Sequence, residues 1–324
     1  MAMASRITIS PPLLNTSTPW ATTLSDLQAI YDSESTGAVT TRTSFPVTGF
    51  QDDPSIHQHA FLPNSSSLNT YGYSPHPLSY YLTSIESIIT SSEPPQSKPF
   101  IISITGTSEE VTSSVSTISE WAHEKRIKVF AEINLSCPNI PNKPPPAYSS
   151  AGLKPYLLAL FDLRESLNVT MVPLGIKTPP YTYQNQFDEL ISAVEEFPGV
   201  LSFITATNTL GSSLYYEFDL PTTNEGEMTP IIASASGTGV GGLAGESIHP
   251  LSLGNVFTIR SMLDKSAHEE IRDIIVIGAG GVGDQAGYKR MRKAGAAAVG
   301  VGTAFGKGGV EIFEKIHGAG AELI

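Results

Sequence analysis

Short β-rich runs alternate with segments of helical period along the chain, and this alternation limits the choice of fold more than any other feature. The eight β-rich runs predict strands at residues 7–14, 37–42, 100–105, 128–135, 172–177, 202–208, 273–278 and 297–302. The segments between and after them predict helices near residues 24–34, 77–90, 108–125, 151–167, 185–197, 250–265, 284–294 and 309–322. Eight strand–helix pairs are typical of a (β/α)8 TIM barrel, whose usual length of about 250 residues this chain of 324 slightly exceeds. We therefore predict an α/β fold in which residues 1–324 form a single barrel domain.

The residues in excess of a typical barrel lie in two long loops between predicted strands and helices. Residues 43–76 are rich in Ser, Pro, Asn and His, and residues 209–249 contain the glycine-rich stretch "SASGTGVGGLAGES". Each loop follows a predicted strand, so both are expected at the carboxyl-terminal face of the barrel. Long loops at this face usually carry substrate contacts and lids.

Polar residues gather where the predicted strands end, which is where barrel enzymes keep their active sites. The strand ends read Asn134 to Cys137, Lys177, Asn208-Thr209, Gly280-Gly281 and Gly302-Thr303, and the first two strands end in Asn15 to Ser17 and Arg42 to Ser44. A single polar residue at a strand end is usually a cap or a solvated loop residue. Because the pattern recurs at seven of the eight ends, we expect one shared active site.

The glycines of "IVIGAGGVGD" allow two interpretations. Gly278, Gly280 and Gly283 match the dinucleotide-binding pattern G-x-G-x-x-G, but the next strand does not end in an acidic residue and only about forty residues remain. The neighbouring strand ends Gly280-Gly281 and Gly302-Thr303 instead predict a site for a phosphate-bearing cofactor or substrate such as FMN. The simpler alternative is that tight strand-to-helix turns require these glycines.

Composition excludes several other functions. The net charge of −12 argues against a nucleic-acid partner, and the longest apolar stretches, of about eight residues, are too short for a bilayer. We expect a cytoplasmic protein without a membrane segment. A single cysteine excludes an internal disulfide framework, and the spacing of the histidines predicts no metal site. The basic residues Lys289, Arg290, Arg292 and Lys293 are interpreted as a solvated helix face, and the histidines His57, His59 and His76 as either surface or lid residues.

Five stretches together carry a family likeness: "AEINLSCPNIPNKPPPAY", "LGIKTPPY", "TATNTLGSS", "GGLAGESIHP" and "IGAGGVGDQAG". They resemble the class 1A dihydroorotate dehydrogenases, FMN enzymes that oxidise dihydroorotate to orotate with fumarate as acceptor. The likeness runs from about residue 8 to 315, and N-x-S-C-P-N is its most specific part. It implies FMN as cofactor, the dihydroorotate/orotate pair and fumarate as small-molecule partners, a homodimer and a role in pyrimidine biosynthesis.

The resemblance also assigns residues. It implies that Cys137 is the catalytic base, on a loop over the flavin. The positions that match substrate contacts are Arg42, Asn69, Asn134, Asn139, Asn208 and Thr209. The positions that match flavin contacts are Ser17, Arg42, Thr43, Asn134, Lys177, Thr207, Gly245, Gly280, Gly281, Gly302 and Thr303.

Three departures from the family pattern leave the substrate open. Arg42 replaces the family's lysine, Tyr71 replaces a methionine, and Thr16 and Thr18 add side chains to the end of the first strand. Arginine is larger and planar, so the exchange is not conservative at a tight site. One alternative is an FMN oxidoreductase that acts on another cyclic or unsaturated substrate. A further alternative is a non-catalytic flavin-binding relative.

Overall fold

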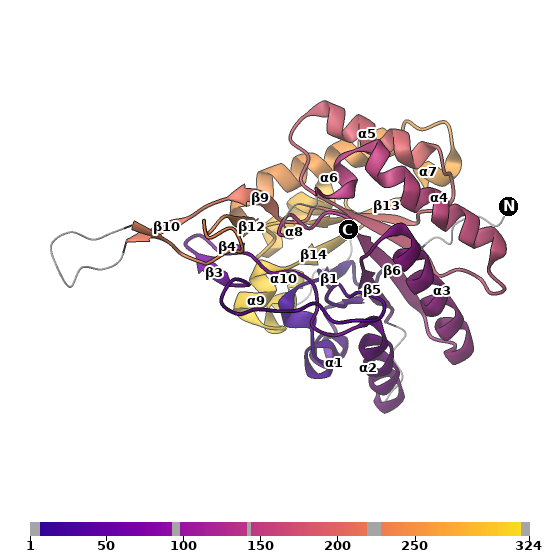
Figure 1. Ribbon diagram of the computed structural model, residues 1–324, viewed down its shortest axis with the longest axis horizontal. Helices are drawn as coiled ribbons and strands as arrows, with labels where there is room; N and C mark the ends of the chain where they lie inside the picture. The colour runs from indigo at the N-terminus through magenta and orange to yellow at the C-terminus, as the bar shows by residue number, and fades with distance from the viewer. Residues whose placement is uncertain (1–6, 93–97, 141–143, 219–227, 319–324) are drawn as a thin grey trace.

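Eight parallel strands form a closed barrel in the computed structural model, which describes residues 7–92, 98–140, 144–218 and 228–318 (Figure 1). They hydrogen-bond in the order β1-β14-β13-β8-β7-β6-β5-β2, and a parallel bridge between Leu14 and Ala38 joins the two ends of this sheet. The strands are β1 (Leu13–Asn15), β2 (Val39–Thr40), β5 (Phe100–Ile104), β6 (Val129–Asn134), β7 (Leu174–Thr178), β8 (Phe203–Ala206), β13 (Ile275–Ala279) and β14 (Ala298–Val301). The prediction of a (β/α)8 barrel is confirmed.

The first two strands are much shorter than predicted. β1 begins only at Leu13, because Pro11 and Pro12 have no backbone N–H with which to continue a ladder. β2 covers two residues, and beyond it a bridge between Ser44 and Ile104 marks the path of the chain. The polar residues that follow both strands therefore still lie at the carboxyl-terminal end of the barrel.

Eight helices correspond to the predicted ones and surround the barrel (Figure 1). Thr23 and Thr107 begin the first and third of them with reciprocal capping boxes, and the first buries Leu27, Ile30 and Tyr31. These helices are α1 (Leu24–Asp32), α2 (Leu78–Ser91), α3 (Ser108–Lys125), α4 (Ser150–Ser166), α5 (Gln184–Glu195), α6 (His249–Leu263), α8 (Gln285–Lys293) and α10 (Glu311–His317). The last predicted helix extends into residues 319–322, which lie outside the described residues. Two short helices, α7 (Glu269–Arg272) and α9 (Thr303–Gly308), were not predicted.

The two long loops contain strands, so their interpretation as plain loops was wrong. β3 (His59–Leu62) and β4 (Ser66–Asn69) from the first loop pair with β12 (Gly241–Gly245) and β9 (Leu210–Ser213) from the second, in the order β3-β4-β12-β9. A two-stranded arm of β10 (Tyr216–Phe218) and β11 (Met228–Pro230) projects away from the barrel (Figure 1). The antiparallel sheet thus joins segments more than a hundred residues apart in the chain.

Apolar side chains fill the amino-terminal half of the barrel. Leu14, Ile101, Phe130, Phe203 and Ile277 belong to one buried cluster of strand residues. Phe203 occupies the space left by Gly175, since a Cβ on this glycine would lie 2.2 Å from the phenyl ring. Polar residues line the carboxyl-terminal half of the barrel. No helix within the described residues is long and apolar enough to cross a membrane.

Candidate functional site

A cavity of about 280 Å³ opens at the carboxyl-terminal end of the barrel, between the strand ends and the antiparallel sheet. Its walls include every residue to which the family resemblance assigned a role. These are Ser17, Arg42, Thr43, Asn69, Asn134, Cys137, Asn139, Lys177, Thr207, Asn208, Thr209, Gly245, Gly280, Gly281, Gly302 and Thr303. The fold therefore brings these residues to one place. The cavity also includes Trp20, Tyr73 and Arg290, which the sequence did not assign to it. It further includes Tyr71, one of the departures from the family pattern, and His59, which the sequence left open as a surface or lid residue.

Cys137 lies three residues beyond the end of β6 and is partly exposed to the cavity. Burial raises the pKa of its thiol, while the backbone N–H of Asn139, the charge of Lys177, the hydroxyl of Tyr73 and the charge of Arg42 oppose this rise. Burial also raises the pKa of Tyr73, so its hydroxyl stays protonated and can donate to the sulfur. The hydrogen-bond donors and cations around Cys137 thus favour the thiolate, whereas burial of the sulfur disfavours it.

Asparagine side chains around Cys137 are fixed by hydrogen bonds. Asn134 Nδ2 donates to Thr43 Oγ1 at 3.0 Å, and Asn134 Oδ1 accepts from Asn208 Nδ2 at 3.2 Å. Asn139 Nδ2 donates to Asn69 Oδ1 at 3.0 Å. Because amides carry both donors and acceptors, this group suits a ligand that itself carries amide or carboxylate groups.

A carboxylate and an ammonium group are buried below these amides. Glu132 accepts from Ser103 Oγ at 3.3 Å and from Thr205 Oγ1 at 2.7 Å, and its side chain is almost fully buried. Burial lowers the pKa of Lys177, whereas the charges of Glu132 and Cys137 raise it. The sequence analysis did not identify Glu132. Its signal was an acidic residue inside the otherwise apolar strand "VFAEIN".

Arg42 differs from the other charged residues of the cavity because one of its buried donors has no partner among the described residues. Its side chain is 7% exposed, and Nη2 is buried without a hydrogen bond to any described residue. The guanidinium lies 5.4 Å from the centre of the Tyr71 ring, in a cation–π contact. Burial lowers the pKa of Arg42. An unpaired buried donor that lines a cavity is a place for an acceptor on a ligand.

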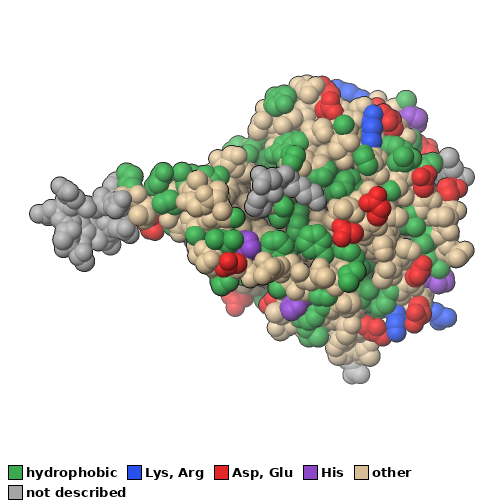
Figure 2. All heavy atoms as spheres, in the orientation of Figure 1, with side chains coloured by type: hydrophobic (Ala, Val, Ile, Leu, Met, Phe, Trp, Pro, Cys, Tyr) green, Lys and Arg blue, Asp and Glu red, His purple; other side chains and the backbone are tan. Residues whose placement is uncertain are grey.

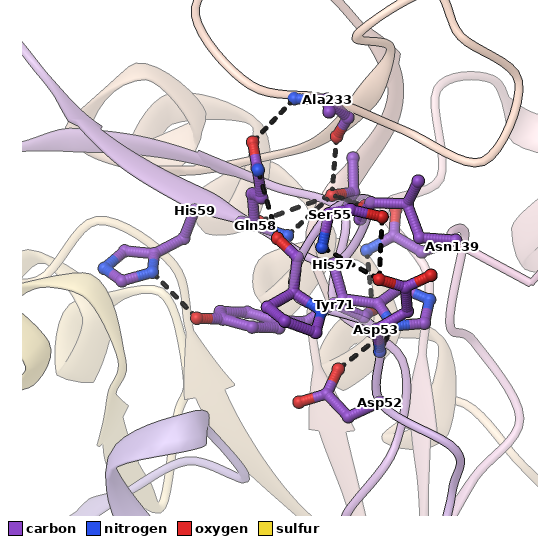
Figure 3. Close-up of polar contacts among 12 residues, drawn as sticks. Asp52, Asp53, Ser55, His57, Gln58, His59, Tyr71, Asn139 and Ala233 are labelled. Atoms are coloured by element: carbon purple, nitrogen blue, oxygen red, sulfur yellow. Dashed lines mark hydrogen bonds and ion pairs between the residues drawn. The ribbon is translucent and has the colours of Figure 1, made fainter.

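Aromatic rings close one side of the cavity. The Tyr71 hydroxyl lies 2.9 Å from His59 Nδ1, and the two side chains face each other in Figure 3. The His59 ring meets Trp20 edge to face at 5.6 Å, and burial lowers its pKa. His59 is therefore a cavity residue, whereas His57 contacts Asp52 and caps its own loop (Figure 3).

The two long insertions are tied together above the cavity. The backbone N–H of Ala233 donates to Gln58 Oε1 at 2.8 Å, and Thr70 Oγ1 donates to the Ala233 carbonyl at 2.9 Å (Figure 3). These bonds supplement the pairing of β4 with β12. The walls contributed by the two insertions thus form one connected layer.

Glycines form the other end of the cavity, at the neighbouring strands β13 and β14. Gly280 and Gly281 have φ values of 133° and 72°, which side-chain-bearing residues rarely adopt. A Cβ on Gly281 would also lie 2.5 Å from His249 Cβ and 2.7 Å from the Gly245 carbonyl oxygen. The turns therefore require glycine for steric reasons, and they leave backbone at the cavity surface.

Buried atoms without partners show that the cavity suits a polar ligand. Among the described residues, Thr18 Oγ1 and Arg42 Nη2 are buried cavity atoms that lack a hydrogen-bond partner. Thr18 lies next to Gly302, since a Cβ on that glycine would lie 3.6 Å from Thr18 Cγ2. A ligand with acceptor groups near both residues would satisfy these atoms.

A barrel with glycine turns at the ends of its last two strands, and with a cysteine and a buried lysine at the other end of the same cavity, has the kind of site in which barrel enzymes bind a phosphate-bearing group. The family model described as "Dihydroorotate dehydrogenase" matches residues 11–323. The chain therefore belongs to the dihydroorotate dehydrogenase family, whose enzymes are flavin-dependent oxidoreductases. This confirms the resemblance seen in the sequence.

Curated relatives agree with this assignment, and a solved structure agrees with the fold. A putative dihydroorotate dehydrogenase A (fumarate) of Streptococcus uberis is 32% identical over 78% of this chain and 70% of its own length. The dihydroorotate dehydrogenase (fumarate) of Trypanosoma cruzi is 31% identical over 94% of this chain and 87% of its own length. The crystal structure of DHODH from Eimeria tenella in complex with ferulenol shares the fold, with a TM-score of 0.71 and 16% identity over 94% of this chain and 79% of that one.

Proposed function

We propose that the protein oxidises (S)-dihydroorotate to orotate, with FMN as cofactor and fumarate as electron acceptor. The observation that carries this proposal is the position of Cys137. It lies in one cavity with the orienting amides of Asn134 and Asn139, the buried cation Lys177 and the glycine turns. Relatives described as fumarate-type dihydroorotate dehydrogenases support the choice of substrate and acceptor.

The cavity suits FMN on the grounds of chemistry and shape. Gly245, Gly280, Gly281, Gly302 and Thr303 would hold the phosphate, where side chains in place of the glycines would collide or restrict the backbone. A further group would contact the rest of the cofactor: Ser17, Arg42, Thr43, Asn134, Lys177 and Thr207. FMN bound there would supply an acceptor for the hydride that leaves C6 of dihydroorotate.

Cys137 acts as the base in this proposal. Its sulfur takes the proton from C5, while the C6–H electron pair leaves as hydride and the C5=C6 bond forms. Burial raises the pKa of the thiol, so the donors from Tyr73 and Asn139 and the charge of Lys177 are needed to make the thiolate accessible. Asn69, Asn134, Asn139, Asn208 and Thr209 would orient the ring and the carboxylate of the substrate.

Arg42 supports a second candidate function. Its guanidinium lies over Tyr71 and leaves Nη2 free, so a planar cation and an aromatic ring together shape the substrate side of the cavity. This arrangement favours a carboxylate substrate, but a cyclic or unsaturated acid other than dihydroorotate would satisfy it equally. The same base and cofactor would then act on a different ring.

Anaerobic titration with dihydroorotate, followed by the visible absorbance of the flavin, tests both candidates. We expect the wild-type protein to bleach and Cys137→Ala to reduce about 100- to 10,000-fold more slowly, the usual range for loss of a general base. Reduction of Cys137→Ala at the wild-type rate would show that Cys137 is not the base. Wild-type protein that stays oxidised while Arg42→Lys bleaches would favour the second candidate.

We also propose that the chain forms a single domain, and that it works as a homodimer in the cytoplasm. The projecting arm carries exposed Tyr216 and Met228, the residues that lead into it include exposed Leu214 and Tyr215, and Figure 2 shows hydrophobic side chains along it. A second copy that covers these side chains would remove them from water. Sedimentation equilibrium of the wild type and of Tyr216→Ser tests this, because the substitution should weaken dimerisation.

A further inference from the structure

The charges at the glycine end of the cavity are unbalanced. Glu246 and Asp284 both line this end and are exposed, and Asp284 caps α8 by accepting from the Gly287 N–H. The other two lysine and arginine residues that line the cavity, Arg42 and Lys177, belong to the site around Cys137. A phosphate ester would add between about 1.5 and 2 negative charges to an end that already holds two carboxylates. Arg290 is the cation present at this end.

Arg290 is exposed, as expected for the basic face of α8, but its side chain also lines the cavity. Its side chain folds back over the first turn of α8, since a Cβ on Gly287 would lie 3.5 Å from Arg290 Nη2. Among the described carboxylates, none forms an ion pair with it. The guanidinium thus keeps its charge available at the N-terminal turn of a nine-residue helix.

His249 holds Arg290 in this position and connects it to the glycine turn. Arg290 Nε donates to His249 Nε2 at 3.1 Å, so this ring nitrogen must be the acceptor. The ring proton then resides on Nδ1, which donates to the Gly280 carbonyl oxygen at 2.8 Å. The imidazole is 6% exposed and packs against Gly281. One buried ring therefore fixes both the guanidinium and the turn.

We infer that Arg290 binds the phosphate of the cofactor and that His249 is its positioning residue. This inference rests on the proposed function, because it takes FMN as the ligand of the cavity. Arg290 Nε is engaged by His249, so the two terminal nitrogens of the guanidinium are the donors to the phosphate oxygens. The backbone at the glycines and the N-terminus of α8 complete the anion site.

Titration of flavin-free protein with FMN and with riboflavin, which lacks the phosphate, tests the inference through quenching of flavin fluorescence. We expect Arg290→Gln to raise the Kd for FMN about 10- to 100-fold, as for loss of a charge-assisted hydrogen bond, and to leave the Kd for riboflavin unchanged. His249→Leu should act in the same direction. Lys293→Gln is the matched control, since it removes the same charge from the same helix at a position that does not line the cavity.

The outcomes separate the inference from the proposed function. An unchanged FMN affinity in Arg290→Gln, or an equal loss of affinity for both flavins, would overturn the role of Arg290 while FMN binding by the wild type stands. Wild-type protein that binds neither flavin would overturn the proposed cofactor together with the inference. Partial recovery in Arg290→Lys, which restores charge without the fork that contacts His249, would support it.

Discussion

Replacing Glu132 by glutamine tests the buried charges inside the barrel. The substitution keeps the shape of the side chain but removes the negative charge of the carboxylate, which accepts hydrogen bonds from the Ser103 hydroxyl at 3.3 Å and from the Thr205 hydroxyl at 2.7 Å. A hydrogen bond to a charged group contributes about 1.5–3 kcal/mol and a neutral one about 0.5–1.5 kcal/mol, so the two bonds together lose about 2 kcal/mol. Lys177 also loses the carboxylate that favours its charged form, which costs about a further 1–3 kcal/mol.

Glu132→Gln should therefore lower the free energy of unfolding by about 3–5 kcal/mol. Urea unfolding of flavin-free protein, followed by far-UV circular dichroism, measures this loss without a contribution from bound cofactor. Glu120→Gln is the control, because Glu120 is exposed and accepts from the Ser116 hydroxyl at 3.0 Å, so its loss should cost less than about 0.5 kcal/mol.

The double variant with Lys177→Met decides whether the two charges are coupled. In the Glu132→Gln background, Lys177→Met should recover about 1–3 kcal/mol, because it removes a buried ammonium group that has lost its compensating charge. In the wild-type background the same change should not stabilise the protein. Equal effects in both backgrounds, within about 0.5 kcal/mol, would show that Glu132 and Lys177 are independent and would refute this reasoning.

Three further perturbations test other parts of the site and the fold. Gly281→Ala should lower the free energy of unfolding, measured in urea, by about 2–4 kcal/mol, because it adds left-handed backbone strain and a collision with His249. Gly237→Ala is the control, since Gly237 has the same φ of 72° but nothing within 4 Å of an added Cβ, and it should lower the free energy of unfolding by only the strain of about 1–2 kcal/mol. The rate of flavin reduction should rise as the pH increases beyond neutrality, because burial raises the pKa of the Cys137 thiol and only the thiolate accepts a proton. A reduction rate that falls over this pH range in stopped-flow measurements would contradict the role of the thiolate. Burial raises the pKa of Tyr81 from 10.0 to about 12, so the stability that this residue contributes below pH 10 should be lost as the pH rises from 10 to 12. Thermal unfolding at each pH should show a smaller loss of stability over this interval for Tyr81→Phe than for the wild type.

The barrel could be predicted from the sequence because its signals are local. Each strand and each helix has its own periodicity, and the alternating order then fixes which strand ends meet at one face. Residues at those ends, such as Cys137, Lys177 and Asn208, could therefore be grouped in advance. The strands of the insertions could not be predicted, because "HAFL" and "SSLN" are short and pair with segments such as β12 that lie far away in the chain.

The residues that the sequence analysis missed depend on the same non-local pairing. His59 reaches the cavity only through the sheet of β3 and β4, and Tyr73 lies in the same insertion. Arg290 sits in a run of basic residues that resembles any solvated helix face, and only its contact with His249 distinguishes it. Glu132 is the exception, because an acidic residue within a buried strand is visible in the sequence itself.

The apolar cluster around Phe203 closes the amino-terminal half of the barrel beneath the cavity. Within the described residues this cluster separates the cavity from the amino-terminal end of the barrel, so we expect reductant and oxidant to enter from the carboxyl-terminal end. We therefore expect the product of the first half-reaction to leave before the acceptor enters. Steady-state rates should then follow a ping-pong pattern, with parallel lines in double-reciprocal plots at several acceptor concentrations.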